Sequence, residues 1–450
     1  MARFEEYFLS LRHRRIAVLG LGVSNRPLVR LLLEFGCNVV GCDRTPREKL
    51  DAEVLELERL GCRLSVGEGY LDDLEADIVF RTPGMHPGNP AIVALKDKGA
   101  EITSEMEVFF ELCPCPILAV TGSDGKTTTT SIIARILETA GKTVWLGGNI
   151  GTPLLPRCRE IMADHIAVVE LSSFQLMDMR RSPHIAVVTN LAPNHLDVHK
   201  DMDEYVQAKK NIFRYQSACD RLILNADNAI TDGFEGTAVT EKFSRSGKDC
   251  ACRVENGTIY VHGHPVLDCS DILLPGVHNI ENYMAAILAV EGLADVESIR
   301  KTARTFGGVK HRIELVRVVN GVRYYNDSIA SSPSRTISGL SSFEEKVILL
   351  AGGYDKHVPF DELGPVICRK VKKLLLSGAT AAAIRAAVEG CDGEKPEIYQ
   401  FDLLDEAITA ATKVAESGDV VLLSPASASF DQFKNFEIRG DYFRQRVMEL

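Results

Sequence analysis

The sequence predicts an α/β protein built from three domains, and three observations support this prediction. The chain has 450 residues, which is too many for one hydrophobic core, because a domain commonly holds about 150 residues. Short apolar strands alternate with amphipathic helices from end to end, a pattern typical of parallel sheets. Glycine-rich turns follow early strands in the first two segments. We expect domains at residues 1–104, 105–308 and 309–450, with a hinge at Gly307 and Gly308.

The composition is ordinary for a globular protein and disfavours several classes of function. Hydrophobic residues make up 45% and charged residues 25% of the chain, and the net charge is −11. This acidic balance argues against a nucleic-acid partner, which would require a basic surface. Residues 1–15 lack the apolar stretch of a signal peptide, and no apolar run reaches membrane-spanning length. We expect a cytoplasmic monomer without a membrane partner, whose 12 cysteines stay reduced, because none forms a C-x-x-C pair.

The first segment predicts a strand, a glycine turn, a helix and a second strand. These elements follow one another in residues 14–43, RRIAVLGLGVSNRPLVRLLLEFGCNVVGCD, and a further strand and a Pro/Gly-rich loop come at residues 76–90. The turn GLGVSN resembles the dinucleotide fingerprint G-x-G-x-x-G, with Asn25 in place of the third glycine. Asp43 ends the second strand, where a ribose hydroxyl would be bound. The missing glycine disfavours NAD, and either another nucleotide diphosphate or a plain tight turn accounts for the pattern.

The second segment contains a shortened phosphate-binding loop. Residues 116–137, PILAVTGSDGKTTTTSIIARIL, predict a buried strand, a loop and a helix that begins at about Lys126. The common spacing G-x-x-x-x-G-K-[ST] requires a glycine at Val120, and the nearest glycine is Gly122. Backbone N–H groups at the start of the helix would hold phosphate oxygens, Lys126 would reach the β- and γ-phosphates, and Thr127 would bind Mg²⁺. The alternative, a strand–turn–helix with a capping threonine, is disfavoured by the Gly-Lys-Thr sequence.

Polar residues follow the next two strands of this segment. The strand AVVEL ends around Glu170, and the strand AVVTNL is followed by His195. Ligands gather at the carboxyl ends of parallel strands, so we expect Glu170 near the phosphate loop as an oxygen ligand of Mg²⁺. His195 follows the same predicted sheet edge, although a single histidine is more often structural. Lys209 lies on a predicted helix, YVQAKKNIF, where a solvated lysine is the ordinary interpretation.

The rest of the chain continues the alternation of strands and helices. Residues 254–266, VENGTIYVHGHPV, predict a hairpin, and residues 279–293 predict a helix. The third segment supplies the strands VRYYND, KVILLAGG, KKLLLSGAT and DVVLLSPASAS. We therefore expect a third parallel sheet.

Seven motifs that follow one another in a single order resemble those of the Mur ligase family. They are TGSDGKT at 121–127, GGNIG at 147–151, ELSSFQL from Glu170, NHLDVH around His195, AKKNIF around Lys209, GVHNIEN at 276–282 and KHR ending at Arg312. The shortened phosphate loop is the form that this family uses. The resemblance spans nearly the whole chain. It implies Rossmann-like first and third domains around a central, P-loop ATPase-like domain, with the third domain closing on ATP.

Within the family, the chain most resembles the members that add D-glutamate to UDP-N-acetylmuramoyl-L-alanine during peptidoglycan precursor synthesis. The tail LSPASASFDQFKNFEIRGDYF and the pattern GLGVSN…GCDRT carry this similarity. The Asp-Asn-Pro-Arg motif of the diaminopimelate- or lysine-adding member is absent. A Mur-family ligase for another amino acid remains the alternative.

The resemblance implies a role for each matching residue. The UDP-substrate would be bound by Gly22, Val23, Ser24, Asn25, Asp43, Arg44, Thr45, Thr82, Pro83, Gly84 and, at its muramoyl part, Asn149. ATP would be bound by Gly122, Ser123, Asp124, Gly125, Lys126, Thr127, Thr128, Asn279, Asn282, Arg312 and Asp327. Two Mg²⁺ ions would be held by Thr127, Glu170, His195 and a carbamylated Lys209. The catalytic residues would be Lys126, His195 and Lys209, and D-glutamate would meet Lys356, Ser429, Phe430 and Phe436.

One position departs from the family pattern. In the stretch NDSIASSP, Ile329 stands where many members carry a lysine after Asp-Ser. If that lysine binds the carboxylate of glutamate, another cation replaces it in this chain. Arg335, six residues further on, is the candidate.

The implied reaction joins a carboxylate to an amine and consumes ATP. The carboxylate of the UDP-substrate would attack the γ-phosphate, and the amine of D-glutamate would attack the resulting acyl phosphate. Two anions meet in the first step, so Lys126 and the metal ions would neutralise their charge. The amine must lose a proton, for which His195 is a candidate base. Closure of the third domain would exclude water, which hydrolyses an acyl phosphate.

Three other functions account for parts of the pattern. A P-loop kinase would explain the phosphate loop but neither the first glycine turn nor the tail. A nicotinamide dehydrogenase would explain only that turn and Asp43. A non-catalytic nucleotide-binding module would leave Lys126, Glu170 and Lys209 unexplained. ATP consumption that requires both a carboxylate and an amine distinguishes the ligase from all three.

Overall fold

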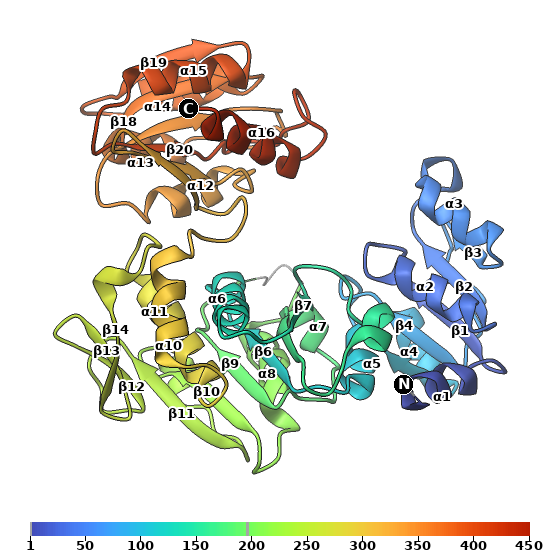
Figure 1. Ribbon diagram of the computed structural model, residues 1–450. Helices are drawn as coiled ribbons and strands as arrows, with labels where there is room; N and C mark the ends of the chain where they lie inside the picture. The colour runs from blue at the N-terminus through green and yellow to red at the C-terminus, as the bar shows by residue number, and fades with distance from the viewer. Residues whose placement is uncertain (1, 195–197) are drawn as a thin grey trace. The chain divides into compact units, whose positions relative to one another are not determined.

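The chain forms three successive α/β sheets, shown in the computed structural model of Figure 1, which describes residues 2–194 and 198–450. It divides into two compact units, one of Met1–Cys269 with Glu281–Thr302 and the other of Ser270–Ile280 with Ala303–Leu450. The first two sheets belong to the first unit and the third sheet to the second. The predicted α/β class with three mostly parallel sheets is confirmed. The domain boundaries at residues 104 and 308 stay a prediction.

The first sheet has five parallel strands in the order β3-β2-β1-β4-β5. They are β1 (Arg15–Leu19), β2 (Asn38–Asp43), β3 (Arg63–Val66), β4 (Ile78–Arg81) and β5 (Glu101–Thr103). Helices α1 (Ala2–Ser10) and α2 (Asn25–Glu34) share a core with one face, and α4 (Pro90–Asp97) packs on the other. Helix α3 (Ala52–Arg59) lies beside α2. The strand order reverses at β1, and a crevice beyond the carboxyl end of such a strand is where ligands bind.

The second sheet has nine strands in the order β14-β13-β12-β11-β10-β9-β6-β8-β7. They are β6 (Ile117–Thr121), β7 (Val144–Gly148), β8 (Ile166–Glu170), β9 (Ile185–Val188), β10 (Arg221–Asn225), β11 (Val239–Ser244), β12 (Cys252–Glu255), β13 (Thr258–Val261) and β14 (His264–Asp268). The pairs from β7 to β12 are parallel, and β12, β13 and β14 form an antiparallel meander. The order reverses at β6, so the loop that follows β6 lies at the switch point.

Helices pack on both sides of the second sheet. Helix α6 (Lys126–Thr139) contacts β6, β7 and β8. The helices α5 (Glu105–Leu112), α7 (Ser173–Leu176) and α8 (Met202–Arg214) share a core with the strands that include Ala119 and Ala186. The remaining helices of this part of the chain are α9 (Ala229–Asp232), α10 (His278–Val290) and α11 (Val296–Thr305). The predicted helix around Lys209 is therefore confirmed as α8.

The predicted hairpin at residues 254–266 is confirmed and belongs to the three-stranded meander. Its two turns are Asn256-Gly257 and His262-Gly263, and all four residues have positive φ. Two-residue turns with this backbone are of type I′, which matches the twist of the flanking strands and favours Asn-Gly. His262 thus occupies a position where asparagine or glycine is more usual.

The third sheet has six strands in the order β15-β16-β20-β17-β18-β19, of which only the β15–β16 pair is antiparallel. The strands are β15 (Glu314–Val319), β16 (Val322–Asn326), β17 (Val347–Ala351), β18 (Val371–Ser377), β19 (Glu397–Phe401) and β20 (Val420–Leu423). Helices α12 (Pro333–Leu340), α13 (Leu363–Lys370) and α14 (Ala381–Glu389) cover one face, and α15 (Leu404–Val414) and α16 (Phe436–Met448) cover the other (Figure 1).

No helix within residues 2–194 and 198–450 is both long enough and apolar enough to cross a membrane.

Helix α5 begins with a fully buried acid. Ser104 caps the helix by accepting a hydrogen bond from Glu107 N at 3.1 Å, and Glu105 is 6% exposed. The Glu105 carboxylate accepts the Leu155 N–H at 3.0 Å, yet burial outweighs this bond and raises the pKa of Glu105 to about 7. A carboxyl buried in this way favours its protonated form.

We expect the substitution Glu105→Gln to remove a pH-dependent loss of stability. The folded state keeps the Glu105 proton up to about pH 7, whereas the unfolded chain releases it near pH 4.5. The contribution to stability is therefore complete below pH 4.5 and is lost as pH rises to 7. Glutamine stays neutral, so the variant should gain up to about 3 kcal/mol on the native chain between pH 5 and pH 8. Thermal unfolding across this range checks it, and a pH-independent difference would contradict it.

Candidate active site

The phosphate loop joins β6 to α6, and its shape depends on two glycines. Gly122 and Gly125 have φ values of +150° and +76°, which glycine adopts without strain. A Cβ at Gly122 would lie 1.9 Å from Thr189 Oγ1, and one at Gly125 would lie 2.4 Å from Asn282 Oδ1. Neither position can hold a side chain without a shift of its neighbour. The predicted start of the helix at Lys126 is confirmed.

The segment that follows β9 holds the phosphate loop in place. Asn190 O accepts the Ser123 N–H at 2.8 Å, and Asn190 Oδ1 accepts the Asp124 N–H at 2.9 Å. Thr189 Oγ1 donates to Asp124 O at 2.6 Å, and the hydroxyls of Ser123 and Tyr205 lie 2.9 Å apart. Sequence analysis did not select Asn190 or Tyr205. The position of Asn190 just beyond the carboxyl end of β9 was the available signal.

Lys126 and the first turn of α6 face the space enclosed by the loop. The Lys126 ammonium donates to Gly122 O at 3.0 Å and to Ser123 O at 2.8 Å. No side chain caps the start of α6, where Gly125 is the N-cap residue. Thr127 is buried, and Thr128 follows it in the first turn. Uncapped N–H groups, a helix N-terminus and a lysine together suit an anionic phosphate.

Glu170 ends β8 and presents a buried carboxylate at the same edge of the sheet. It is 1% exposed, and its Oε1 accepts a hydrogen bond from Asn149 Nδ2 at 2.8 Å. Its Oε2 is buried and has no hydrogen-bond partner among the residues that the structure describes. A buried carboxylate oxygen of this kind fits a hard divalent cation such as Mg²⁺. The structure also brings Asn149 against Glu170, since Asn149 N donates to Glu170 O at 2.8 Å.

Lys209 projects from α8 into the interior beside the phosphate loop. It is 2% exposed, and its ammonium donates to Thr121 Oγ1 at 3.2 Å and lies 5.0 Å from the centre of the Tyr205 ring. Burial, followed by repulsion from Lys126, lowers the pKa of Lys209 well below its ordinary value, against the attraction of Glu170. The interpretation as a solvated helix lysine is therefore wrong. A buried amine with a lowered pKa is a nucleophile in its neutral form.

The predicted ligand and base His195 lies outside the described residues. Another histidine of the same motif, His199, is described. It is buried, its Nε2 lies 2.9 Å from Ser173 Oγ, and its ring stacks on Phe174 at 5.4 Å. His199 therefore supports α7 through Ser173 and Phe174.

The first glycine turn and Asp43 meet at the carboxyl edge of the first sheet. Asp43 accepts hydrogen bonds from Leu21 N at 2.8 Å and Thr45 N at 2.9 Å. Burial raises the pKa of this carboxyl, but these hydrogen bonds outweigh burial and leave the pKa lowered. A Cβ at Gly20 would lie 2.8 Å from Thr82 Cγ2, and Thr82 N donates to Leu19 O at 3.0 Å. The predicted UDP-site residues of β1, β2 and β4 are thus gathered around one turn.

The predicted UDP-site residues differ in how exposed their side chains are. Val23 is 78% exposed and Arg44 is exposed, whereas Asn25 is buried. The Asn25 amide donates to Gly20 O at 2.8 Å and to Leu19 O at 3.2 Å, so it fixes the shape of the turn. The other predicted members lie in the loops of the same edge: Gly22 and Ser24 before α2, and Pro83 and Gly84 after β4.

The second unit gathers its predicted residues at the carboxyl edge of the third sheet. Asp327 follows β16, and its carboxylate accepts hydrogen bonds from Ser424 Oγ at 2.8 Å and Ile313 N at 3.3 Å. Burial raises the pKa of Asp327 to about 7, although these bonds and Arg312 oppose the rise. Arg439 is buried and donates to Ser328 Oγ, Ser328 O, Ser427 O and Ala428 O at 2.9–3.0 Å. It therefore links the loops that follow β16 and β20.

The predicted D-glutamate residues lie in this linked region. The Lys356 ammonium lies 5.8 Å from the centre of the Phe430 ring, which is 59% exposed. Ser429 is buried, and Phe436 O accepts a hydrogen bond from Ser328 Oγ at 2.8 Å. These contacts bring the ends of β16, β17 and β20 together.

The cationic side chain of Arg335 lies beside Ile329, the residue that departs from the family pattern. Arg335 Nη1 donates to Ile329 O at 3.2 Å, and Arg335 is exposed. The predicted substitute for the missing lysine is thus adjacent to the main chain of Ile329. Its role toward glutamate stays a prediction.

The two asparagines assigned to ATP on α10 have different partners. Asn282 Oδ1 accepts a hydrogen bond from Thr129 Oγ1 at 3.2 Å, which places Asn282 against the phosphate loop. Asn279 donates to Pro275 O at 2.6 Å and belongs to the second unit. The structure therefore brings Asn282 directly to the loop, whereas the role of Asn279 stays a prediction.

Comparison with known proteins identifies the family. The Mur ligase middle domain matches residues 120–290, and the Mur ligase glutamate ligase domain matches residues 311–427. The UDP-N-acetylmuramoylalanine–D-glutamate ligase of Acetivibrio thermocellus is 51% identical over 99% of this chain and 98% of its own length. The ligase of the same name from Clostridium botulinum strain Hall is 48% identical over the whole length of both chains.

A solved structure shares the fold. The UDP-N-acetylmuramate-alanine ligase of Thermotoga maritima has a TM-score of 0.58 at 18% identity, over 97% of this chain and 100% of that one. The chain belongs to the Mur ligase family of ATP-dependent, amide-bond-forming ligases. Within that family it groups with relatives named UDP-N-acetylmuramoylalanine–D-glutamate ligases. The resemblance inferred from the motifs is confirmed, and the kinase and dehydrogenase alternatives are set aside.

We expect Gly125→Ala to abolish nucleotide binding through a collision as well as through backbone strain. Gly125 and Gly141 have nearly equal φ values, +76° and +78°, but a Cβ at Gly141 meets nothing within 4 Å. Gly141→Ala is thus a matched control that carries the strain alone, about 1 kcal/mol. Binding of ATP to each variant, measured by calorimetry, should be lost in the first and retained in the second. Equal binding by both variants would contradict the role given to the loop shape.

Proposed function

We propose that this chain adds D-glutamate to UDP-N-acetylmuramoyl-L-alanine, with ATP as the energy source, in cytoplasmic peptidoglycan precursor synthesis, and that it acts as a monomer. The observation that carries this proposal is the 51% identity, over 99% of the chain, to a ligase of that name. The site supports it, because two separate turns suited to phosphates occur in one chain. A ligase for another amino acid is the second candidate, favoured by the Ile329 departure alone.

The phosphate loop serves the first step, in which the substrate carboxylate attacks the γ-phosphate and ADP leaves. The N–H groups at the start of α6 and the Lys126 ammonium bind the phosphate oxygens and offset their charge. Asn282, packed against the loop through Thr129, contacts the adenine nucleotide. Asn279, Arg312 and Asp327 are the other residues that we assign to ATP.

Four residues would hold two Mg²⁺ ions: Thr127, Glu170, His195 and Lys209. Bound Mg²⁺ would neutralise the charge of the phosphoryl group and of the substrate carboxylate. The buried Oε2 of Glu170, which has no hydrogen-bond partner among the described residues, is the observation that favours this arrangement. Asn149 orients the Glu170 carboxylate through its Oε1, and it would also contact the muramoyl part of the substrate.

Lys209 becomes a metal ligand when its neutral amine adds CO₂. The amine nitrogen forms a bond to the carbon of CO₂ and loses a proton to solvent, which leaves a carbamate anion. Burial and the charge of Lys126 favour the neutral amine that this step requires. The product places an anion where the buried amine stood, and this anion would suit Mg²⁺ beside Glu170.

The amine of D-glutamate attacks the acyl phosphate in the second step and releases phosphate. Lys356, Ser429, Phe430 and Phe436 surround the amino acid, and Arg335 binds one of its carboxylates in place of the missing lysine. His195, when it is not bound to Mg²⁺, is the candidate base for the proton of the attacking amine. Closure of the third domain, residues 309–450, with its hinge at Gly307 and Gly308, would keep water from the acyl phosphate.

Phosphate release distinguishes the candidate functions. The full chain is incubated with ATP, Mg²⁺ and UDP-N-acetylmuramoyl-L-alanine, each time with D-glutamate, L-glutamate, L-alanine, L-lysine or meso-diaminopimelate. We expect release with D-glutamate alone, together with an amide product identified by mass. Release with a different amino acid would retain the ligase chemistry and reject the proposed pocket. The absence of release with all five would reject the proposed reaction.

The adjacent lysines of α8 provide a matched test of the carbamate. Lys209 is buried, whereas the Lys210 ammonium lies over the Phe234 ring at 4.7 Å. Lys209→Ala should lower kcat at least about a hundredfold, because a charged group at the reacting centre is lost, and Lys210→Ala should leave it nearly unchanged. In ¹³C-bicarbonate the native chain should show one carbamate resonance that Lys209→Ala lacks. Its persistence in that variant would contradict the assignment.

A further inference from the structure

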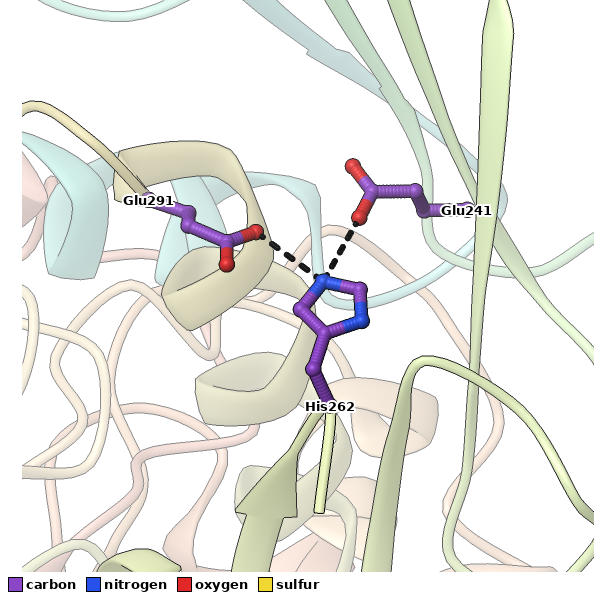
Figure 2. A group of neighbouring side chains, drawn as sticks. All are labelled: Glu241, His262 and Glu291. Carbon is purple, nitrogen blue, oxygen red and sulfur yellow. Dashed lines mark hydrogen bonds and ion pairs between the residues drawn. The ribbon is translucent and has the colours of Figure 1, made fainter. Parts of the chain in front are cut away.

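Three potential metal ligands from distant parts of the sequence meet on the surface of the first unit. Glu241 lies on β11, His262 forms the turn between β13 and β14, and Glu291 follows the last residue of α10. Figure 2 shows the imidazole directed toward both carboxylates. None of these residues belongs to the ligase site.

The spacing of the three donor groups fits a tetrahedral ion. His262 Nε2 lies 3.1 Å from Glu241 Oε1 and 3.4 Å from Glu291 Oε2, and one donor atom from each residue falls within 4.8 Å of the others. Tetrahedral bonds of about 2.0 Å place neighbouring donor atoms about 3.3 Å apart. Both of the measured separations from the imidazole nitrogen are close to this value.

A hydrogen bond from the imidazole explains this arrangement less well than a bound cation does. Nε2 carries at most one hydrogen, which cannot point at two carboxylate oxygens in different directions. A cation placed between the three groups attracts both oxygens at once. Imidazole together with carboxylates suits Zn²⁺, whereas Mg²⁺ and Ca²⁺ prefer oxygen ligands alone.

Arg221 pairs with both carboxylates, and on Glu291 it contacts the same Oε2 atom that faces His262. Its Nη2 lies 2.6 Å from Glu241 Oε2 and 3.2 Å from Glu291 Oε2, while Glu241 Oε1 faces His262. The guanidinium thereby orients the Glu241 carboxylate, as a residue behind a metal ligand commonly does. It also offsets one of the two negative charges, so the cluster keeps one negative charge when the imidazole is neutral.

The cluster is open to solvent on one side, and it lies where a bound ion would connect separate elements of the first unit. The His262 side chain is 49% exposed and that of Glu291 39%, whereas that of Glu241 is 13% exposed. Water therefore reaches one side and completes the coordination. An ion held here would join the β13–β14 turn and β11 to the carboxyl end of α10, the helix whose first turns carry Asn282.

We propose that Glu241, His262 and Glu291 form a Zn²⁺ site, completed by water, that ties the β13–β14 turn to β11 and to the end of α10. The site is independent of the ligase reaction. Its effect is on the stability of the first unit, because an ion that binds the folded chain alone stabilises it.

Metal binding by the full chain tests this proposal, with variants of one hairpin as matched controls. His262→Asn removes the imidazole and keeps the positive φ of the turn, since asparagine is favoured there. His264→Asn removes an exposed imidazole two residues further on. Glu291→Gln removes one carboxylate charge. Zn²⁺ is added to chelator-treated protein, binding is followed by calorimetry, and thermal unfolding is measured with and without the ion.

The proposed ligase site would also bind divalent ions. Zn²⁺ binding is therefore compared between variants, and binding by one protein alone does not decide the test. We expect the native chain and His264→Asn to bind one more Zn²⁺ than His262→Asn, or to bind it at least about tenfold more tightly. Zn²⁺ should raise their thermal midpoint more than that of His262→Asn, and Glu291→Gln should fall between them. Co²⁺ in place of Zn²⁺ should give a tetrahedral absorption spectrum that His262→Asn lacks.

Two results would overturn the site. Equal Zn²⁺ stoichiometry, affinity and thermal shift in the native chain and His262→Asn would show that no ion binds there. A loss of stability in His262→Asn that is the same with and without Zn²⁺ would identify the cluster as an ion-pair network only. Ligase activity of His262→Asn should equal that of the native chain in either event, which separates this test from that of the proposed function.

Discussion

Burial of charge at one edge of the central sheet is the constraint on which the active site depends. Glu170 and Lys209 are 1% and 2% exposed, although a buried ionised group costs several kcal/mol. The protein relieves this cost incompletely by itself, since one oxygen of Glu170 has no partner among the described residues and the pKa of Lys209 is strongly lowered. Ligands that supply the missing charges would therefore be bound strongly at this edge. The same constraint explains why the phosphate loop is fixed by main-chain and hydroxyl contacts rather than by further charges.

One topological rule positions the residues of all three sheets. The strand order reverses at β1 in the first sheet and at β6 in the second, and β20 returns between β16 and β17 in the third. Loops beyond the carboxyl ends of strands at such points diverge and leave room for a ligand. The glycine turn at Gly20, the phosphate loop and the loops joined by Arg439 occupy these three positions. The three edges that we propose to bind nucleotide or substrate thus depend on strand order as much as on individual side chains.

The sequence predicted what depends on local pattern. Apolar strands, the helix start at Lys126 and the hairpin follow from periodicity and glycine position, and the motifs identified the family. Contacts between distant segments were not predictable in this way. The hydroxyls of Ser123 and Tyr205 are in contact although the two residues are 82 positions apart in the sequence. No sequence pattern around either residue predicts this contact. Asn25 stands at the third glycine of the fingerprint and is assigned to the UDP-substrate, yet it is buried and its amide supports the turn.

The third sheet shows how burial can make a charge responsive to a ligand. Asp327 has a pKa of about 7, because burial outweighs the hydrogen bonds from Ser424 and Ile313. A carboxyl with this pKa is divided between its neutral and charged forms near neutral pH. A cation that approaches it needs to change the balance by only about 1.4 kcal/mol to shift the pKa by one unit. Arg439, whose pKa burial lowers to about 10, stays charged and holds the surrounding loops. The second unit therefore combines Arg439, a fixed cation that links the loops after β16 and β20, with Asp327, an acid whose charge would depend on what binds beside it.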